Sequence, residues 1–160
     1  TRLLVTHGRA TEAVKALFHD ENGLSPASNG HGQLSFSYLP ALTQTDYDHL
    51  LWACDLNFVR GEDSLVRALW AGRPFVWQIY PQDDGAHHAK LDAFLDWLDA
   101  PASLRRFHHA WNGLGDPDHA RWPAPDEFDA WGTCAQAARE RLLAQDDLVS
   151  QLLGFVAKKR

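Results

Sequence analysis

One short segment in the middle of the chain constrains the fold more than any other part. The apolar run Leu56–Val59 has the composition of a buried parallel strand. Residues 60–64 then form a polar loop, and residues 65–71 have a helical pattern that ends at Gly72, the expected C-cap. A second apolar run follows at residues 75–80. The polar loop therefore lies beyond the carboxyl end of a strand, where open α/β sheets bind their ligands.

The alternation of strands and helices extends over the first half of the chain. It predicts an α/β fold: a Rossmann-like parallel sheet with flanking helices and a helical C-terminal tail. We expect one domain, with a βα core at about residues 1–85 and a mostly helical part at 86–160. The predicted strands are residues 3–5, 33–39, 56–59 and 74–80. The predicted helices are residues 11–18, 65–71, 87–98, 103–111 and 128–144, together with one helix capped by Thr45 or Asp46 and a last one capped by Asp146 or Asp147. Residues 20–32 are predicted to form a loop.

Charge and composition restrict the class of partner. The formal charge of −6 argues against nucleic acid as the main ligand, although local arginines can still attract a small anion. No apolar run is long enough to cross a membrane. Cys54 and Cys134 are expected to be free thiols in a reducing cytoplasm, with a disulfide as the alternative. Because Thr1 opens directly onto a strand pattern, we expect a piece of a longer protein; a trimmed small domain is the alternative.

Nine histidines raise the question of a metal site. His87-His88 and His108-His109 are adjacent pairs, and adjacent side chains on a helix point in different directions. No cysteine or carboxylate joins them at a recognised ligand spacing. We therefore expect no metal.

The polar loop carries the residues with the clearest chemistry. A helix that starts there directs free N–H groups and a partial positive charge toward a ligand such as phosphate. Arg60 could hold a diphosphate through paired hydrogen bonds, and Ser64 could donate to a phosphate oxygen or cap the helix. Glu62 and Asp63 are unexpected beside an anion. They could accept from sugar hydroxyls, or all three polar side chains could simply cap the helix.

Two more residues are candidates at the same edge of the sheet. Gln44 lies in the predicted loop after the second strand, where its amide could contact a nucleobase or only solvent. Tyr80 ends the last predicted strand and could reach the ligand or be an ordinary rim aromatic.

The residues around this loop resemble those of a known family, the bacterial elongation factor P arginine rhamnosyltransferases. The Arg-Gly-Glu-Asp-Ser motif in a strand-to-helix setting is the most specific part of the resemblance, which covers most of the chain. The matching residues are Gln44, Asp48, 50–52, 54–64, 72–77, Ile79, Tyr80, Phe107, Trp111, Asn112, Asp147, Leu148, Gln151, Leu152 and Phe155.

The resemblance implies a function and a set of roles. Members of this family are similar to two-domain GT-B glycosyltransferases, and they transfer rhamnose with inversion from dTDP-β-L-rhamnose to an arginine of elongation factor P. This chain looks like the donor-binding C-terminal half, without the N-terminal acceptor domain and its acceptor-activating aspartates. By resemblance, Gln44 would contact the thymine base. The diphosphate would be held by Arg60, Asp63 and Ser64. Glu62 would be the critical acid, and Tyr80 would be a further donor contact.

One position departs from the family pattern. The family tends to have an aromatic residue three positions before the glutamine, stacked on the base, and this chain has Ala41 there. Stacking on a base can be worth about 1–3 kcal/mol, so the base preference is open; Phe36 and Tyr38 are candidates to replace the aromatic. The alternatives are therefore another GT-B nucleotide-sugar transferase and a non-catalytic α/β interaction module.

Overall fold

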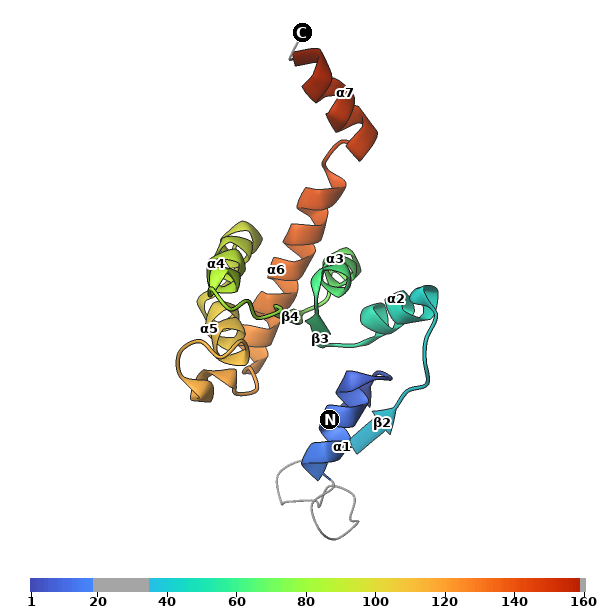
Figure 1. Ribbon diagram of the computed structural model, residues 1–160, viewed down its shortest axis with the longest axis vertical. Coiled ribbons are helices and arrows are strands. Elements are labelled where there is room, and N and C mark those ends of the chain that lie inside the picture. The colour runs from blue at the N-terminus through green and yellow to red at the C-terminus, as the bar shows by residue number, and fades with distance from the viewer. Residues whose placement is uncertain (19–34, 159–160) are drawn as a thin grey trace. The chain divides into compact units, whose positions relative to one another are not determined.

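The computed structural model describes residues 1–18 and 35–158 (Figure 1). It has two compact units, Thr1–Tyr47 and Asp48–Arg160, and each is described by itself. The described chain is an α/β protein with short parallel strand pairs and flanking helices, as the sequence predicts.

The first unit contains a parallel strand pair and one helix. Strands β1 (Arg2–Val5) and β2 (Ser35–Tyr38) pair with Leu3 opposite Phe36, and helix α1 (Arg9–Phe18) connects them in sequence. The predicted strands and helix are thus confirmed in their described parts. The loop predicted at residues 20–32 lies outside the described residues.

Helix α2 (Gln44–Ala53) begins in this unit, and its start corrects one prediction. Thr43 Oγ1 accepts a hydrogen bond from the Asp46 backbone N–H and donates to the Asp46 carboxylate. The capping residue is therefore Thr43, and not Thr45 or Asp46. Gln44, predicted to lie in a loop, is the first residue of the helix because this cap precedes it.

The second unit contains the second strand pair and most of the helices. Strands β3 and β4 are parallel, with Val59 opposite Trp77. Helix α3 packs on β3, α5 packs on β4, and α6 contacts α3, α4 and α5 (Figure 1). The elements are β3 (Asn57–Arg60), α3 (Glu62–Ala71), β4 (Phe75–Gln78), α4 (Ala86–Leu98), α5 (Ala102–Trp111), the 3₁₀ turn η1 (Pro117–Ala120), α6 (Pro125–Leu143) and α7 (Leu148–Lys158).

In this unit two helix starts, one strand end and the burial of one strand differ from the prediction. Strand β4 ends at Gln78, so Tyr80 lies two residues beyond the strand that it is predicted to end. Helix α3 begins at Glu62, so the predicted five-residue loop shrinks to the turn around Gly61. Helix α6 begins at Pro125, three residues early, because proline is well suited to the first turn of a helix. Strand β3 alternates instead of being buried on both faces, since Asn57 and Val59 are buried while Phe58 is exposed.

The core of the second unit is built from large apolar side chains. Trp77 of β4 and Trp131 of α6 are almost completely buried. The helical periodicity predicts Leu91, Phe94, Leu95 and Leu98 on the inward face of α4; the three leucines are almost fully buried, and Phe94 is only partly buried. Burial of each such leucine contributes about 1.5–3 kcal/mol. This core gives the turn around Gly61 a rigid support.

Side chains of α5 take the place of a neighbouring strand along β4. The His108 Nε2 accepts from the Trp77 N–H at 3.0 Å, and Asn112 Oδ1 accepts from the Ile79 N–H at 2.9 Å. The Asn112 amide also donates to the Trp77 carbonyl. His108 is fully buried, and burial lowers its pKa from the ordinary 6.5 to about 4, so this ring is neutral at pH 7.

Helix α7 is apolar and yet exposed. Leu148, Leu152 and Phe155 are each more than half exposed. Asp147 caps this helix, accepting from the N–H groups of Val149 and Ser150, so the predicted cap is confirmed. No helix in the described ranges is both long and apolar enough to cross a bilayer.

Both cysteines are free thiols, as predicted. Cys134 is buried, and its thiol faces the Leu98 carbonyl oxygen at 3.4 Å. Burial raises the pKa of both thiols above the ordinary value, which favours the thiol over the more reactive thiolate.

Candidate functional site

The candidate site is the turn that links β3 to α3. Gly61 occupies it with φ 78° and ψ 173°, a conformation that is essentially restricted to glycine. A Cβ built at Gly61 would lie 2.9 Å from Cε2 of Tyr80 and 3.0 Å from its hydroxyl oxygen. The Tyr80 ring therefore covers the turn, and only glycine lets it approach so closely.

A buried tryptophan anchors this turn to the core. The indole Nε1–H of Trp77 donates to the Gly61 carbonyl oxygen at 3.1 Å, and the Gly61 N–H donates to the Gln78 carbonyl. The sequence does not mark Trp77 as a site residue. Its apolar strand context indicates only a core residue, and the direction of the indole N–H has no sequence signal.

Helix α3 begins without a side-chain cap. Gly61 is the N-cap residue, and having no side chain it supplies no side-chain cap hydrogen bond. Side-chain capping by Glu62, Asp63 or Ser64 is therefore wrong, because Glu62 and Asp63 are already inside the helix and Ser64 lies there half-buried. The two acids do lie in the first turn, where a negative charge complements the helix dipole. An uncapped helix start presents N–H donors and the positive end of the helix dipole. This is the feature that suits an anionic ligand.

The first of the two unexpected acids is already neutralised. The Glu62 carboxylate accepts from Lys90 Nζ of α4 at 2.8 Å. This hydrogen bond is the largest cause that holds the pKa of Glu62 below its ordinary value. Lys90 also lies over the Trp77 ring, with its Nζ 5.9 Å from the ring centroid. Nothing in the sequence marks Lys90, because it is far from the motif along the chain.

The second acid belongs to a small ionic cluster. Arg67 donates to Asp63 at 3.0 Å and to both carboxylate oxygens of Asp48 at 2.9 Å. These carboxylates raise the pKa of Arg67 above its ordinary value. The spacing from Asp63 to Arg67 is that of a helical i,i+4 pair, so this part of the cluster could have been found in the sequence.

Arg60 is the cation of the site that remains available. Its guanidinium carbon lies 5.0 Å from the centroid of the Tyr80 ring, and in the part of the chain that the structure describes it has no carboxylate partner. The three carboxylates and three cations around the turn balance in charge. Pairing of Glu62 and Asp63 therefore leaves Arg60 and the helix start as the exposed positive features.

The structure brings most of the predicted site residues together. Arg60, Glu62, Asp63 and Ser64 lie on one turn, and Tyr80 covers it. Gln44 belongs to the other unit, at the start of α2, so its contact with a base stays a prediction. Among the described residues no group of three His, Cys, Asp or Glu side chains is placed to hold a metal ion.

Fold and site together define a class of protein. It is an α/β protein whose uncapped helix start, beside an arginine at the end of a parallel strand, suits an anionic ligand. Residues 1–157 match the model of one family, described as elongation factor P (EF-P) rhamnosyltransferase EarP. The chain belongs to this family.

Individual relatives agree with the family match. A protein-arginine rhamnosyltransferase of Pseudomonas putida is 45% identical over 166 residues, which is 96% of this chain and 42% of the relative. One from Pseudomonas aeruginosa is 43% identical over 130 residues, covering 78% of this chain and 35% of the relative. A solved structure described as the structural basis for EarP-mediated arginine glycosylation of EF-P matches 99% of this chain and 52% of its own, with 32% identity and a TM-score of 0.74.

The chain spans less than half the length of these two curated relatives. It is similar to the C-terminal half of the family proteins, as the sequence predicts.

Proposed function

We propose that this chain is the donor-binding part of an inverting protein-arginine rhamnosyltransferase. The donor would be dTDP-β-L-rhamnose and the acceptor an arginine of elongation factor P. The observation that carries the proposal is the uncapped start of α3, with Arg60 beside it at the carboxyl end of β3. The family match and the relatives named protein-arginine rhamnosyltransferase support it.

The proposed mechanism assigns the anionic features of the donor to this turn. Inversion requires the acceptor nitrogen to attack the anomeric carbon in line while the diphosphate leaves on the opposite side. Arg60 and the N–H groups of Asp63 and Ser64 would stabilise the negative charge that develops on the leaving diphosphate. This electrostatic role needs no metal ion.

Glu62 would act on the sugar side of the donor. Its carboxylate is ionised and held by Lys90, so it can accept hydrogen bonds from sugar hydroxyls. Tyr80 would line the donor through its ring, which already covers Gly61 and Arg60. Gln44 would contact the base.

The acceptor half of the active site would come from an N-terminal domain in a two-domain GT-B architecture. The exposed apolar side chains of α7, including Leu152 and Leu153, support the need for a further packing partner. We place the protein in the cytoplasm, because a translation factor is the proposed acceptor and the two thiols are free.

The proposal is tested by titrating dTDP into the chain with isothermal calorimetry. Saturable binding is expected, and Arg60→Ala should weaken it by about 1–3 kcal/mol because a charge-assisted contact is lost. Arg105→Ala is the matched control. Arg105 of α5 forms an ion pair with Asp96 of α4, so this substitution should leave dTDP binding unchanged. No heat at millimolar dTDP, with a correctly folded chain, would refute the proposal.

A second candidate is a transferase of the same fold that uses another base. Ala41, exposed before α2, is the observation that favours it, because no aromatic stands there to stack on thymine. Parallel titrations with dTDP, UDP and GDP separate the two candidates. Tighter binding of UDP or GDP than of dTDP would select the second.

A further inference from the structure

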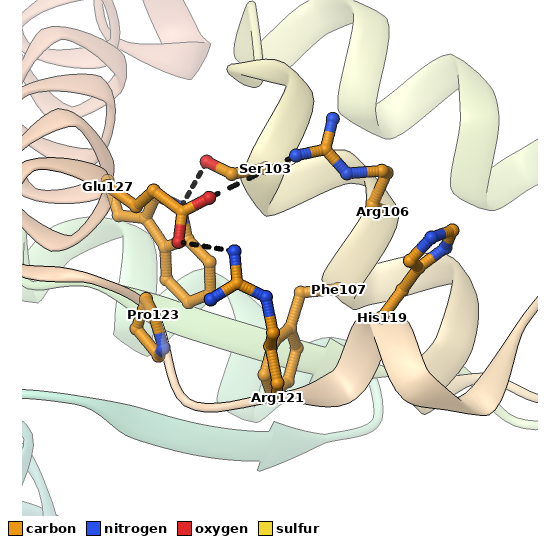
Figure 2. Close-up of a pocket in the computed structure, with 8 residues that line it drawn as sticks. Ser103, Arg106, Phe107, His119, Arg121, Pro123 and Glu127 are labelled. Atoms are coloured by element: carbon orange, nitrogen blue, oxygen red, sulfur yellow. Dashed lines mark hydrogen bonds and ion pairs between the residues drawn. The ribbon is translucent and has the colours of Figure 1, made fainter.

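A second cluster of positive side chains surrounds a cavity in another part of the second unit. The cavity measures about 150 Å³ and lies between α5, η1 and the beginning of α6 (Figure 2). Arg106 and Arg121 reach it from two sides, and His119 lines it as well. None of these residues belongs to the turn around Gly61 or is used by the proposed transfer reaction.

The two guanidinium groups share a single carboxylate. Glu127 Oε1 lies 4.0 Å from Arg106 Nη2, and its Oε2 lies 3.5 Å from Arg121 Nη2 (Figure 2). Both distances are too long for a good hydrogen bond. Glu127 is mostly buried and is fixed by a 2.9 Å hydrogen bond from the Ala124 N–H, so it cannot move out to satisfy either arginine.

The cavity therefore retains donors and positive charge. In the described ranges, no hydrogen bond has the guanidinium of Arg106 or Arg121 as its donor. Ser103 Oγ accepts from the Trp131 indole at 3.0 Å, which leaves the serine hydroxyl hydrogen free to be donated into the cavity. Two arginines against one glutamate leave an excess of one positive charge among these side chains.

The floor of the cavity strengthens these interactions. Phe107 and Trp131 line it and are almost completely buried, while Arg106 and Arg121 are 50% and 66% exposed. A ligand would thus enter from solvent and meet the charges above an apolar base. Charge-assisted contacts are stronger where the surroundings are less polar than water.

We propose that this cavity binds a phosphate group, at a site separate from the nucleotide-sugar turn. Donors from α5, η1 and the following loop approach from different directions, as the oxygens of a tetrahedral phosphate require. A planar carboxylate accepts hydrogen bonds mainly in its own plane and would use fewer of them. Each of the two arginines would contact Glu127 on one side and the phosphate on the other.

The test is a titration of the ¹⁵N-labelled chain followed by NMR. Inorganic phosphate and glycerol 1-phosphate are added in separate series, each against sodium chloride of equal ionic strength. Saturable shifts are expected at the Ser103 and Glu127 amides and at the Trp131 indole. Saturation with inorganic phosphate alone would identify the free ion as the ligand, and saturation with both would show that the cavity accepts phosphomonoesters.

Variants make the assignment specific. Arg106→Ala and Arg121→Ala should each weaken the phosphate affinity by about tenfold or more. Arg105→Ala, one residue away but paired with Asp96, should not change it. Arg60→Ala should also leave these shifts intact, which separates this site from the proposed donor site.

Three results would overturn the proposal. The first is a set of shifts that sodium chloride reproduces. The second is unchanged binding in the Arg106→Ala, Arg121→Ala double variant, whose fold is checked by circular dichroism. The third is acetate binding as tightly as phosphate, because a carboxylate site would then explain the cavity.

Discussion

Two helix starts in the second unit are built in opposite ways. Helix α7 begins after Asp147, whose carboxylate accepts from two backbone N–H groups and from the Ser150 hydroxyl. Helix α3 begins after Gly61 with no side-chain cap hydrogen bond. The closed start satisfies its own donors, whereas the open start leaves them to a ligand. The difference shows why acids in a first helical turn are not evidence of capping by themselves.

The open start depends on support from behind. Trp77 holds the Gly61 carbonyl, and His108 accepts the backbone N–H of Trp77. The closed start needs no such support, because Asp147 and Ser150 are only three residues apart in sequence. The following experiments test this contrast.

Acid should weaken the support of the open start most strongly. The pKa of His108 is about 4 when folded and 6.5 when unfolded, so the unfolded chain binds the proton more readily. The contribution of neutral His108 to the free energy of unfolding is therefore fully present above pH 6.5. It decreases by about 3 kcal/mol as the pH drops to 4. Urea unfolding between pH 7 and pH 4 measures this loss.

His108→Gln removes the titrating group while keeping a possible acceptor for the Trp77 N–H. It should flatten the pH dependence, and His49→Ala, at an exposed histidine, should retain it. An equally steep loss in His108→Gln would show that another group is responsible.

Glycine substitutions should separate backbone strain from the function of the open start. Gly61→Ala and Gly113→Ala both place a side chain at positive φ, 78° and 77°, and each should cost about 1–3 kcal/mol of stability. Only at Gly61 would the new Cβ meet Tyr80; at Gly113 nothing lies within 4 Å. Calorimetry with dTDP should therefore show lost binding for Gly61→Ala alone. Equal loss in both variants would argue against a role for the turn.

Removal of the closed cap should have a local effect. Asp147→Ala deprives the first turn of α7 of its acceptor, so amide hydrogen exchange at Val149 and Ser150 should become several-fold faster. Binding of dTDP should stay unchanged. Asp146→Ala is the control, because its carboxylate makes none of these contacts. A change in dTDP affinity in the Asp147→Ala variant would show that the two helix starts do not act independently.

Most of the fold could be predicted because the spacing of apolar residues along the sequence indicates which side chains are buried. The stripe Leu91, Leu95 and Leu98 and the parallel pairing of β3 with β4 followed from pattern alone. Boundaries were harder, because they depend on single hydrogen bonds: Thr43, and not its neighbours, caps α2. Only the structure shows that α3 starts directly after Gly61.

The site was predictable as a motif but not as an arrangement. Arg60, Glu62 and Asp63 follow one another in sequence, so their proximity was certain in advance. Lys90 and Trp77 come from other elements, and their contacts with Glu62 and Gly61 are set by tertiary packing. Those contacts explain why two acids can stand beside a proposed anion site.

The smallest expected effect concerns the pair that neutralises the first acid. Lys90→Ala removes an exposed ion pair and should change stability by at most about 1 kcal/mol. The pKa of Glu62 should rise toward its ordinary value of 4.5, because the Lys90 hydrogen bond is the largest cause of its depression. The pair stabilises the fold above that pH and less as the pH falls through the lowered pKa. NMR titration of the Glu62 carboxyl carbon measures the shift; if the Lys90→Ala titration curve coincides with that of the parent chain, Lys90 does not hold Glu62, and the two acids of the open start would need another explanation.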